Sequence, residues 1–218
     1  MDQLRIEFGH GADLTGANLQ ALEEFCRKAE AEGAENWSLS NWELKPHSVL
    51  YCLLKEQRFA APNGRFYMLF DRDELVSVSG IYRADFDPAV AVAGVRAYTL
   101  RASRTRQATA RRTFFHGDHI FPEQLRWTQA CGFRGIILTF NDHNRRLVEF
   151  LSRIRERKAV LFGLKPATAA QDFYSGFELL PDKVLIKNTP QYVMYRKLDA
   201  DFEFRFPVEL SKVQQSLD

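Results

Sequence analysis

The chain has 218 residues, 45% of them hydrophobic, so it can bury one sizeable core. Thirty basic side chains against 28 acidic ones give a formal net charge of +2, which excludes the strongly basic balance of a general nucleic-acid coating protein. No apolar run is long enough to cross a membrane, and Asp2 and Glu7 stand where a signal peptide would be basic. We therefore expect a cytoplasmic protein that does not associate with membranes.

The first part of the chain predicts a strand followed by two helices. Apolar residues alternate with charged ones in LRIEF (4–8), which is typical of a half-buried strand. From residue 13 to residue 31 the apolar residues recur at helical spacing, and Gly33 follows as a stop signal. HSVLYCLLKEQRF (47–59) predicts a shorter second helix. The apolar stripe of the first helix consists of Leu22, Phe25, Cys26 and Ala29.

The middle of the chain is rich in strands. RFYMLF (65–70) and LVSVSGIYR (75–83) carry β-branched and aromatic residues and are separated by a charged turn, which predicts an antiparallel hairpin. AVAGVRAYTLRAS (91–103) predicts a third strand in succession.

The second half of the chain predicts two further helices and three further strands. Pro122 is tolerated only in the first turn of a helix, and Gly132 ends the same helix. RGIILTF is a short apolar run, as expected of a central strand that is buried on both faces. The expected elements are a helix at 118–133, a strand at 134–140, a long helix at 141–158, an insertion at 158–172 and strands at 174–180 and 191–198.

Arginine is concentrated in one stretch, RASRTRQATARRTFFHG (101–117). Five arginines lie between Arg101 and Arg112, and there is no Asp or Glu between Pro88 and Gly117. Because the charge is local while the net charge of the chain is small, the stretch indicates a local anion site. A phosphorylated cofactor is the anion that we expect there.

Four features, in this order and spacing, resemble the GCN5-related N-acetyltransferase (GNAT) superfamily. They are a strand ending near Ser103, a glycine-bearing loop feeding a helix, the strand IILTF followed by NDHN, and Gly176-Phe177 before the last hairpin. The resemblance implies an α/β (α+β) fold with a mixed, splayed central sheet flanked by helices. The strand at 94–102 should run parallel to the strand at 135–140 and diverge from it. It also implies one domain at 1–200, followed by a C-terminal extension at 201–218.

The resemblance further implies acetyl-CoA or another acyl-CoA as co-substrate. RTFFHG places Arg112 and Gly117 at the ends of the family's phosphate loop, but Phe115 occupies the position of its middle glycine. Asp118 follows at once, as an opposing charge or a helix cap. The residues implied to bind the cofactor are Arg111, Arg112 and Gly117 for its phosphates, the backbones of Leu100 and Ala102 for pantetheine, and Asn141 and Asn144, which are equally suited to capping a helix.

The usual catalytic acid of the family is missing. Its tyrosine lies seven residues past the asparagine, and counting from Asn144 leads to Leu151. Tyr174 is the nearest substitute, although a tyrosine at this place is also a common packing residue. His116 is the candidate general base, and it is equally compatible with a solvated loop position. The spacing of the histidines does not call for a metal, and we expect none.

The implied activity is transfer of an acyl group from acyl-CoA to an amine of a small molecule or peptide, by direct attack on the thioester. An acyl-homoserine-lactone-synthase-like transferase is an alternative on the same fold. A non-catalytic module is another, because Phe114 and Phe115 next to Arg111 and Arg112 are suited to binding single-stranded nucleic acid or an acidic partner. The three cysteines are interpreted as reduced thiols in the core.

Overall fold

A computed structural model of the chain describes residues 4–9, 14, 16–33, 57–101, 103, 116–141, 173–174, 176–186 and 189–206. Most of the expected helix at 47–59, nearly all of the helix at 141–158 and the whole insertion at 158–172 lie outside these residues. The arginine stretch is described only at 101, 103, 116 and 117.

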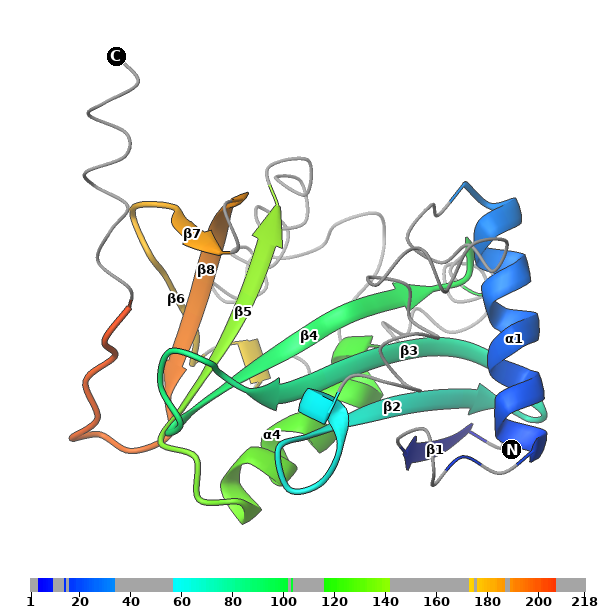
Figure 1. Cartoon of the computed structure of the whole chain (residues 1–218), viewed down its shortest axis with the longest axis horizontal. Coiled ribbons are helices and arrows are strands. Elements are labelled where there is room, and N and C mark those ends of the chain that lie inside the picture. The colour runs from blue at the N-terminus through cyan, green and yellow to red at the C-terminus, as the bar shows by residue number, and fades with distance from the viewer. Residues whose placement is uncertain are drawn as a thin grey trace.

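A single mixed sheet forms the centre of the described part of the molecule (Figure 1). Its strand order is β1-β2-β3-β4-β5-β8-β6, and β7 also pairs with β8. The ladder between β4 and β5 is parallel and the others are antiparallel. The expected mixed sheet is thus confirmed. The strands are β1 (Leu4–Gly9), β2 (Gly64–Asp71), β3 (Glu74–Arg83), β4 (Val90–Thr99), β5 (Gly135–Asn141), β6 (Glu178–Leu179), β7 (Val184–Ile186) and β8 (Thr189–Lys197).

The sheet splays between β4 and β5, as expected (Figure 1). Only the first part of β4, from Val90 to Ala93, pairs with β5. Relative to the residues of β3 that face it, β4 then carries one extra residue between Val92 and Val95 and another between Val95 and Tyr98. Extra residues of this kind bend a strand and increase its twist, so β4 turns away from β5.

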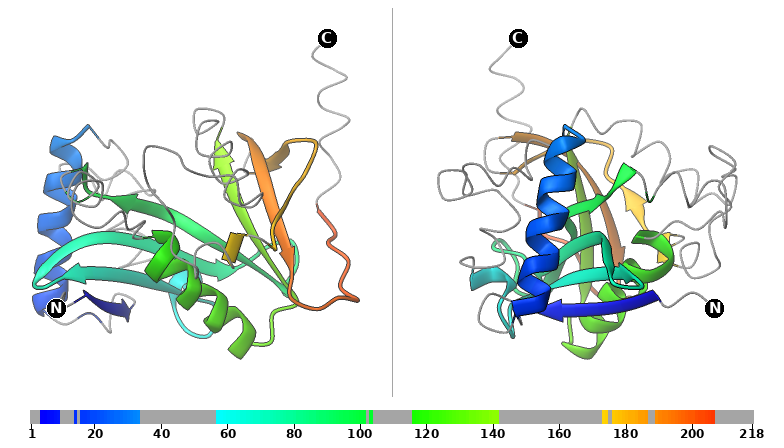
Figure 2. Two further views of the ribbon diagram at one scale, coloured as in Figure 1. Left: turned by 180° about the vertical axis from the view of Figure 1, so that it is seen from behind. Right: turned by 90° about the vertical axis from the view of Figure 1, so that its right-hand side faces the viewer.

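The two faces of the sheet are covered by different helices (Figure 2). The helix α1 (Gly16–Ala31) buries the predicted stripe of Leu22, Phe25, Cys26 and Ala29 against β2 and β3. Gly33 follows with φ +79°, in the left-handed region that ends helices. No described helix is long and apolar enough to span a membrane.

The opposite face is covered by α4 (Phe121–Ala130), which is preceded by the π-helical turn η5 (His116–Ile120). Pro122 lies in the first turn of α4, as predicted, and Gly132 ends the helix with φ +73°. Asp118 does not cap α4, because η5 continues helically into it; the N-cap is Ile120, which makes no side-chain cap hydrogen bond.

Two predictions from the sequence are wrong. Tyr174, the first residue of the strand expected at 174–180, forms a helical turn with Phe173, and only Glu178–Leu179 pairs as β6. Both aromatic rings are buried, which two consecutive strand residues on opposite faces of an edge strand rarely achieve. The strand β7 was not expected. Cys26 is buried as predicted, and burial raises the pKa of its thiol to about 12, but Cys131 is exposed.

The segment that follows β8 packs across the outer face of β5 and β8. Phe202 is buried, and the rings of Phe204 and Phe206 stack 5.3 Å apart between their centroids. Tyr195 of β8 contacts both of the latter rings. Although these residues lie beyond the domain range expected at 1–200, they complete the apolar cluster on this half of the sheet.

Gly135, the first residue of β5, leaves room for this segment. A Cβ atom there would lie 2.5 Å from the Phe204 ring and 2.8 Å from the Phe202 ring. We expect Gly135→Ala to lower the free energy of unfolding by about 1 to 3 kcal/mol, as overpacking does, in a urea titration. Gly16→Ala is the control, because a Cβ atom at Gly16 meets nothing within 4 Å. Equal stability of both variants and the wild type would show that the segment does not pack on β5.

Candidate active site

The open edge of β4 is the feature from which the site is built. From Gly94 to Thr99, β4 pairs with β3 on one side but has no described partner on the side of β5. β5 likewise continues from Thr139 to Asn141 with β8 as its only partner in the described residues. In an antiparallel ladder alternate residues direct their N–H and C=O groups away from the partner strand. Backbone donors and acceptors of β4 therefore line the split.

A buried glutamine holds the bend of β4. The Gln124 side-chain amide donates to the Gly80 carbonyl at 3.0 Å and to Ser79 Oγ at 3.1 Å, both on β3. Its oxygen accepts the Gly94 N–H at 3.3 Å. Gly94 has φ +69°, and neither β3 nor β5 has a residue in register with it. Because Gln124 is fully buried, the amide links α4, β3 and the bend without competition from water.

Removing this amide should loosen the bend. We expect Gln124→Leu to lower the free energy of unfolding by about 1 to 3 kcal/mol for each buried group left without a partner, measured by urea titration. Gln129→Leu, at an exposed position of the same helix, should change it by no more than about 0.5 kcal/mol. Equal effects of the two substitutions would contradict the assigned role of Gln124.

An aromatic cluster closes the inner end of the split. Phe121, at the start of α4, stacks on Phe173 with ring centroids 5.0 Å apart and meets Tyr174 edge to face at 5.6 Å. A Cβ atom at Gly94 would lie 3.2 Å from Leu138 of β5 and 3.6 Å from the Phe121 ring. The N-terminal end of α4 therefore lies where β4 and β5 separate.

Two buried hydroxyl groups, one just past β4 and one in the aromatic cluster, have no hydrogen-bond partner among the described residues. Tyr174 is fully buried, and its Oη has no hydrogen-bond partner among the described residues. Burial raises the pKa of Tyr174 well above its usual range, and the negative charge of Asp118 raises it further. Ser103, just past β4, is also buried with its Oγ unpartnered in the part of the chain that the structure describes. Such groups are costly unless a water or a ligand satisfies them.

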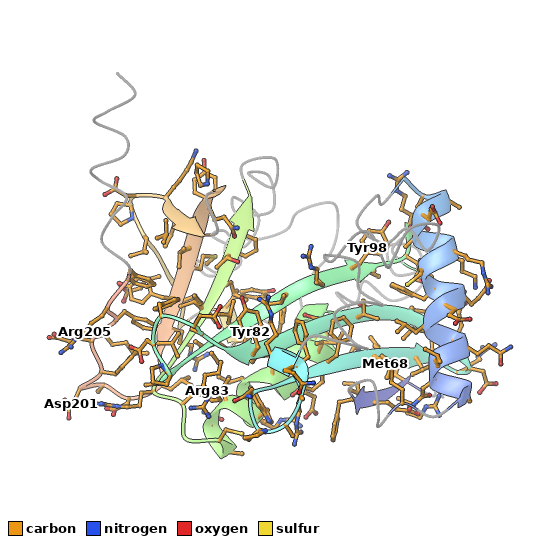
Figure 3. All side chains as sticks on the ribbon, in the orientation of Figure 1. Met68, Tyr82, Arg83, Tyr98, Asp201 and Arg205 are labelled. Atoms are coloured by element: carbon orange, nitrogen blue, oxygen red, sulfur yellow. The ribbon has the colours of Figure 1, made fainter. Side chains whose placement is uncertain are left out.

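The exit of β4 is tied to α1 by Glu32. One carboxylate oxygen accepts the Tyr98 hydroxyl at 2.8 Å, and both accept the Arg101 N–H at 2.8 and 2.9 Å. Figure 3 shows Tyr98 near the end of β4, beside α1. The carboxylate thus fixes the point at which the chain leaves the sheet and enters the arginine stretch.

The residues predicted for the site are described only in part. Ala102, Arg111, Arg112 and Asn144 lie outside the described residues. His116 and Gly117 begin η5, and Asn141 ends β5. Leu100 is buried; its N–H donates to the Val76 carbonyl and its carbonyl accepts from Ser103.

The sequence analysis expected the splay between β4 and β5 but did not identify Gln124 or Glu32. A glycine within a predicted strand was the available signal for the bend. The polar residues carry no such signal, because buried and solvated glutamates and glutamines look alike in a sequence.

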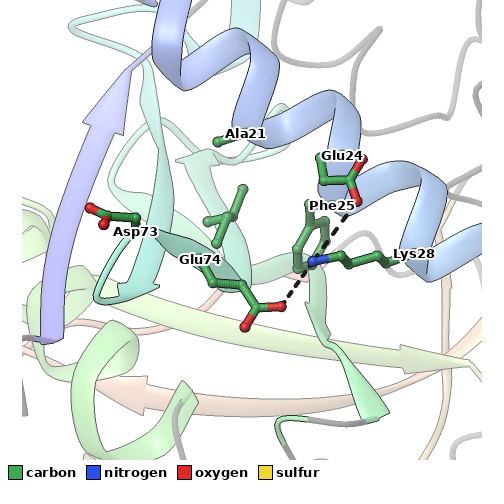
Figure 4. A pocket seen from close by; sticks show the side chains of 7 residues that line it. Ala21, Glu24, Phe25, Lys28, Asp73 and Glu74 are labelled. Carbon is green, nitrogen blue, oxygen red and sulfur yellow. Dashed lines mark hydrogen bonds and ion pairs between the residues drawn. The ribbon is translucent and has the colours of Figure 1, made fainter.

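A hollow of about 510 Å³ between α1 and the β2–β3 turn is a different surface. Three carboxylates and one lysine line it, and Lys28 lies 2.9 Å from Glu74 and 3.9 Å from Glu24 (Figure 4). It contains no residue of the split or of the arginine stretch, so we do not assign the site to it.

Comparisons with known proteins agree on the fold. Neither a protein-family model nor a curated protein matches the sequence. An acetyltransferase of the GNAT family from Streptococcus pneumoniae matches with 12% identity and a TM-score of 0.52, over 89% of this chain and 99% of that one. The PaiA N-acetyltransferase of Thermoplasma acidophilum, solved with coenzyme A, matches with 14% identity and a TM-score of 0.52, over 88% of this chain and 99% of that one. An aminoglycoside acetyltransferase solved with coenzyme A and kanamycin matches with 12% identity and a TM-score of 0.52, over 90% of this chain and 95% of that one.

The chain therefore has the GNAT fold, as its sequence led us to expect. The described residues fit an acyl-CoA at the split in two respects. The edge of β4 is open, among the described strands, for pairing with an amide-bearing arm, and the buried hydroxyls of Ser103 and Tyr174 have no hydrogen-bond partner among the described residues. Asp118, in the turn before α4, and Glu123, in the first turn of α4, carry negative charges that oppose a phosphate.

Proposed function

We propose that the protein is an acyl-CoA-dependent N-acyltransferase that transfers an acyl group, such as acetyl, to an amine of a small molecule or peptide. The observation that carries this proposal is the open edge of β4 at the split. The fold neighbours solved with coenzyme A support it, and the aminoglycoside complex supports an amine as acceptor. Bound acyl-CoA would supply the acyl group as a reactive thioester.

Acyl-CoA would extend from the split toward the arginine stretch. We assign its pantetheine arm to the outward backbone groups of β4, together with Ala102, Asn141 and Asn144. Of Leu100 only the carbonyl can take part, by accepting a second hydrogen bond, because its N–H is already bonded to Val76. We assign the phosphates of acyl-CoA to Arg111, Arg112 and the turn at Gly117. Arginine is suited to this role because its guanidinium group donates two parallel hydrogen bonds to a phosphate.

Tyr174 and His116 are the residues to which we assign proton transfers. The raised pKa of Tyr174 means that its hydroxyl keeps its proton at neutral pH, so it can donate to a leaving thiolate but cannot act as a base. A histidine titrates near neutral pH, so His116 is suited to take the proton of the attacking amine.

Tyr174→Phe separates a catalytic hydroxyl from a packing ring. The substitution keeps the ring and removes an unpartnered buried hydroxyl, so the free energy of unfolding should stay the same or rise by about 1 kcal/mol. We expect kcat for acyl transfer to fall by about 10² to 10⁴ while acetyl-CoA affinity, measured by calorimetry, is unchanged. An unchanged kcat would show that Tyr174 only packs.

Arg112→Ala tests the phosphate assignment. The variant should bind acetyl-CoA more weakly by about 1.5 to 3 kcal/mol in a calorimetric titration, the range for a hydrogen bond to a charged group. Arg126→Ala, at an exposed position of α4, is the control and should bind as the wild type does.

A binding module for nucleic acid would give a different result in the same experiment. Acetyl-CoA would then produce no heat with any variant. Affinity for a single-stranded oligonucleotide would be measurable, and Arg112→Ala would reduce its salt dependence by roughly one ion for each lost phosphate contact.

A further inference from the structure

The strand β1 forms one edge of the sheet. It pairs with β2 on one side, and no described strand lies on its other side. Figure 1 shows it at the border of the sheet, below β2. An edge strand exposes a row of backbone N–H and C=O groups that can pair with another strand.

The side chains of β1 divide cleanly between the two faces. Ile6 and Phe8 lie opposite Leu69 and Tyr67 of β2, on the face that α4 covers further along. Phe8 is 56% exposed, which is unusual for a large apolar side chain in this molecule.

The charged residues lie on the other face. The Arg5 guanidinium group stacks on the Phe70 ring, 4.5 Å from its centroid, and Glu7 accepts a hydrogen bond from Asn18 of α1. Arg5 and Glu7 of the same strand form an ion pair at 3.0 Å, and the Arg5 side chain remains 52% exposed.

The sequence of β1 is complementary to itself when it is reversed. In an antiparallel pair of two such strands centred on Ile6, Arg5 of each faces Glu7 of the other, and Leu4 of each faces Phe8 of the other. In such a pair the apolar side chains of the two strands meet on one face of the joined sheet, and the oppositely charged side chains meet on the other face.

We propose that β1 pairs antiparallel with β1 of a second copy of the chain, about a twofold axis at Ile6, so that the two sheets become continuous. The charges select this register. A shift by two residues in either direction places Arg5 opposite Arg5 or Glu7 opposite Glu7, and a shift by one residue mixes the apolar and charged faces. The interface is isologous, so each ion pair occurs twice. This inference is independent of the proposed activity.

Charge reversal provides the test, with oligomeric state measured by sedimentation velocity over a range of concentrations. We expect the wild type to be a dimer. Arg5→Glu and Glu7→Arg should each weaken dimerisation at least tenfold, because each places like charges opposite one another twice. When the two variants are mixed in equal amounts, Arg5→Glu of one copy faces Glu7→Arg of the other, and a heterodimer should form.

The mixing experiment distinguishes pairing of β1 from loss of the ion pair within one chain, which mixing cannot restore. Arg27→Glu reverses a similarly exposed arginine on α1 and should leave the dimer intact. A monomeric wild type, a dimer that neither reversal weakens, or a mixture that stays monomeric would each overturn the proposal.

Discussion

The bend of β4 after Ala93 is the constraint on which the rest of the structure depends. Two extra residues turn the strand away from β5, and at the bend the Gly94 N–H donates to the side-chain oxygen of the buried Gln124. Because the same amide also binds β3, the bend is fixed to both the sheet and α4. A regular β4 would remain paired with β5, and the backbone groups that now line the split would be used up within the sheet.

Packing on the two faces of the sheet maintains this opening from both ends. The aromatic cluster of Phe121, Phe173 and Tyr174 fills the point where β4 and β5 separate. At the far end, Glu32 attaches the exit of β4 to α1. The aromatic segment after β8 covers the outer face of β5 and β8, and α1 packs on β2 and β3. Each half of the sheet, on either side of the split, is therefore held by contacts outside it. The geometry of the site is therefore a property of the whole core.

Regular periodicity made most of the fold predictable. The stripe of α1, the hairpin of β2 and β3 and the apolar run of β5 each follow one period over their full length, and each formed as predicted. The errors occurred where tertiary contacts decide. Tyr174 adopts a helical turn because its ring and that of Phe173 are both buried, and β7 is too short to show a period. Of the candidate site, the sequence indicated the arginines and Tyr174, whereas the split depends on a bend and on a glutamine that have no distinctive pattern.

Hydrogen exchange at the edge of β4, followed by mass spectrometry, tests most directly the claim that the split is the binding surface. Amides of residues 95–99 that face β5 have no partner in the described sheet, so they should exchange rapidly in the free protein. With saturating acetyl-CoA these amides should become protected, while exchange in β1 and β2 should not change. If calorimetry shows that acetyl-CoA binds and residues 95–99 nevertheless exchange as before, the cofactor does not occupy the split.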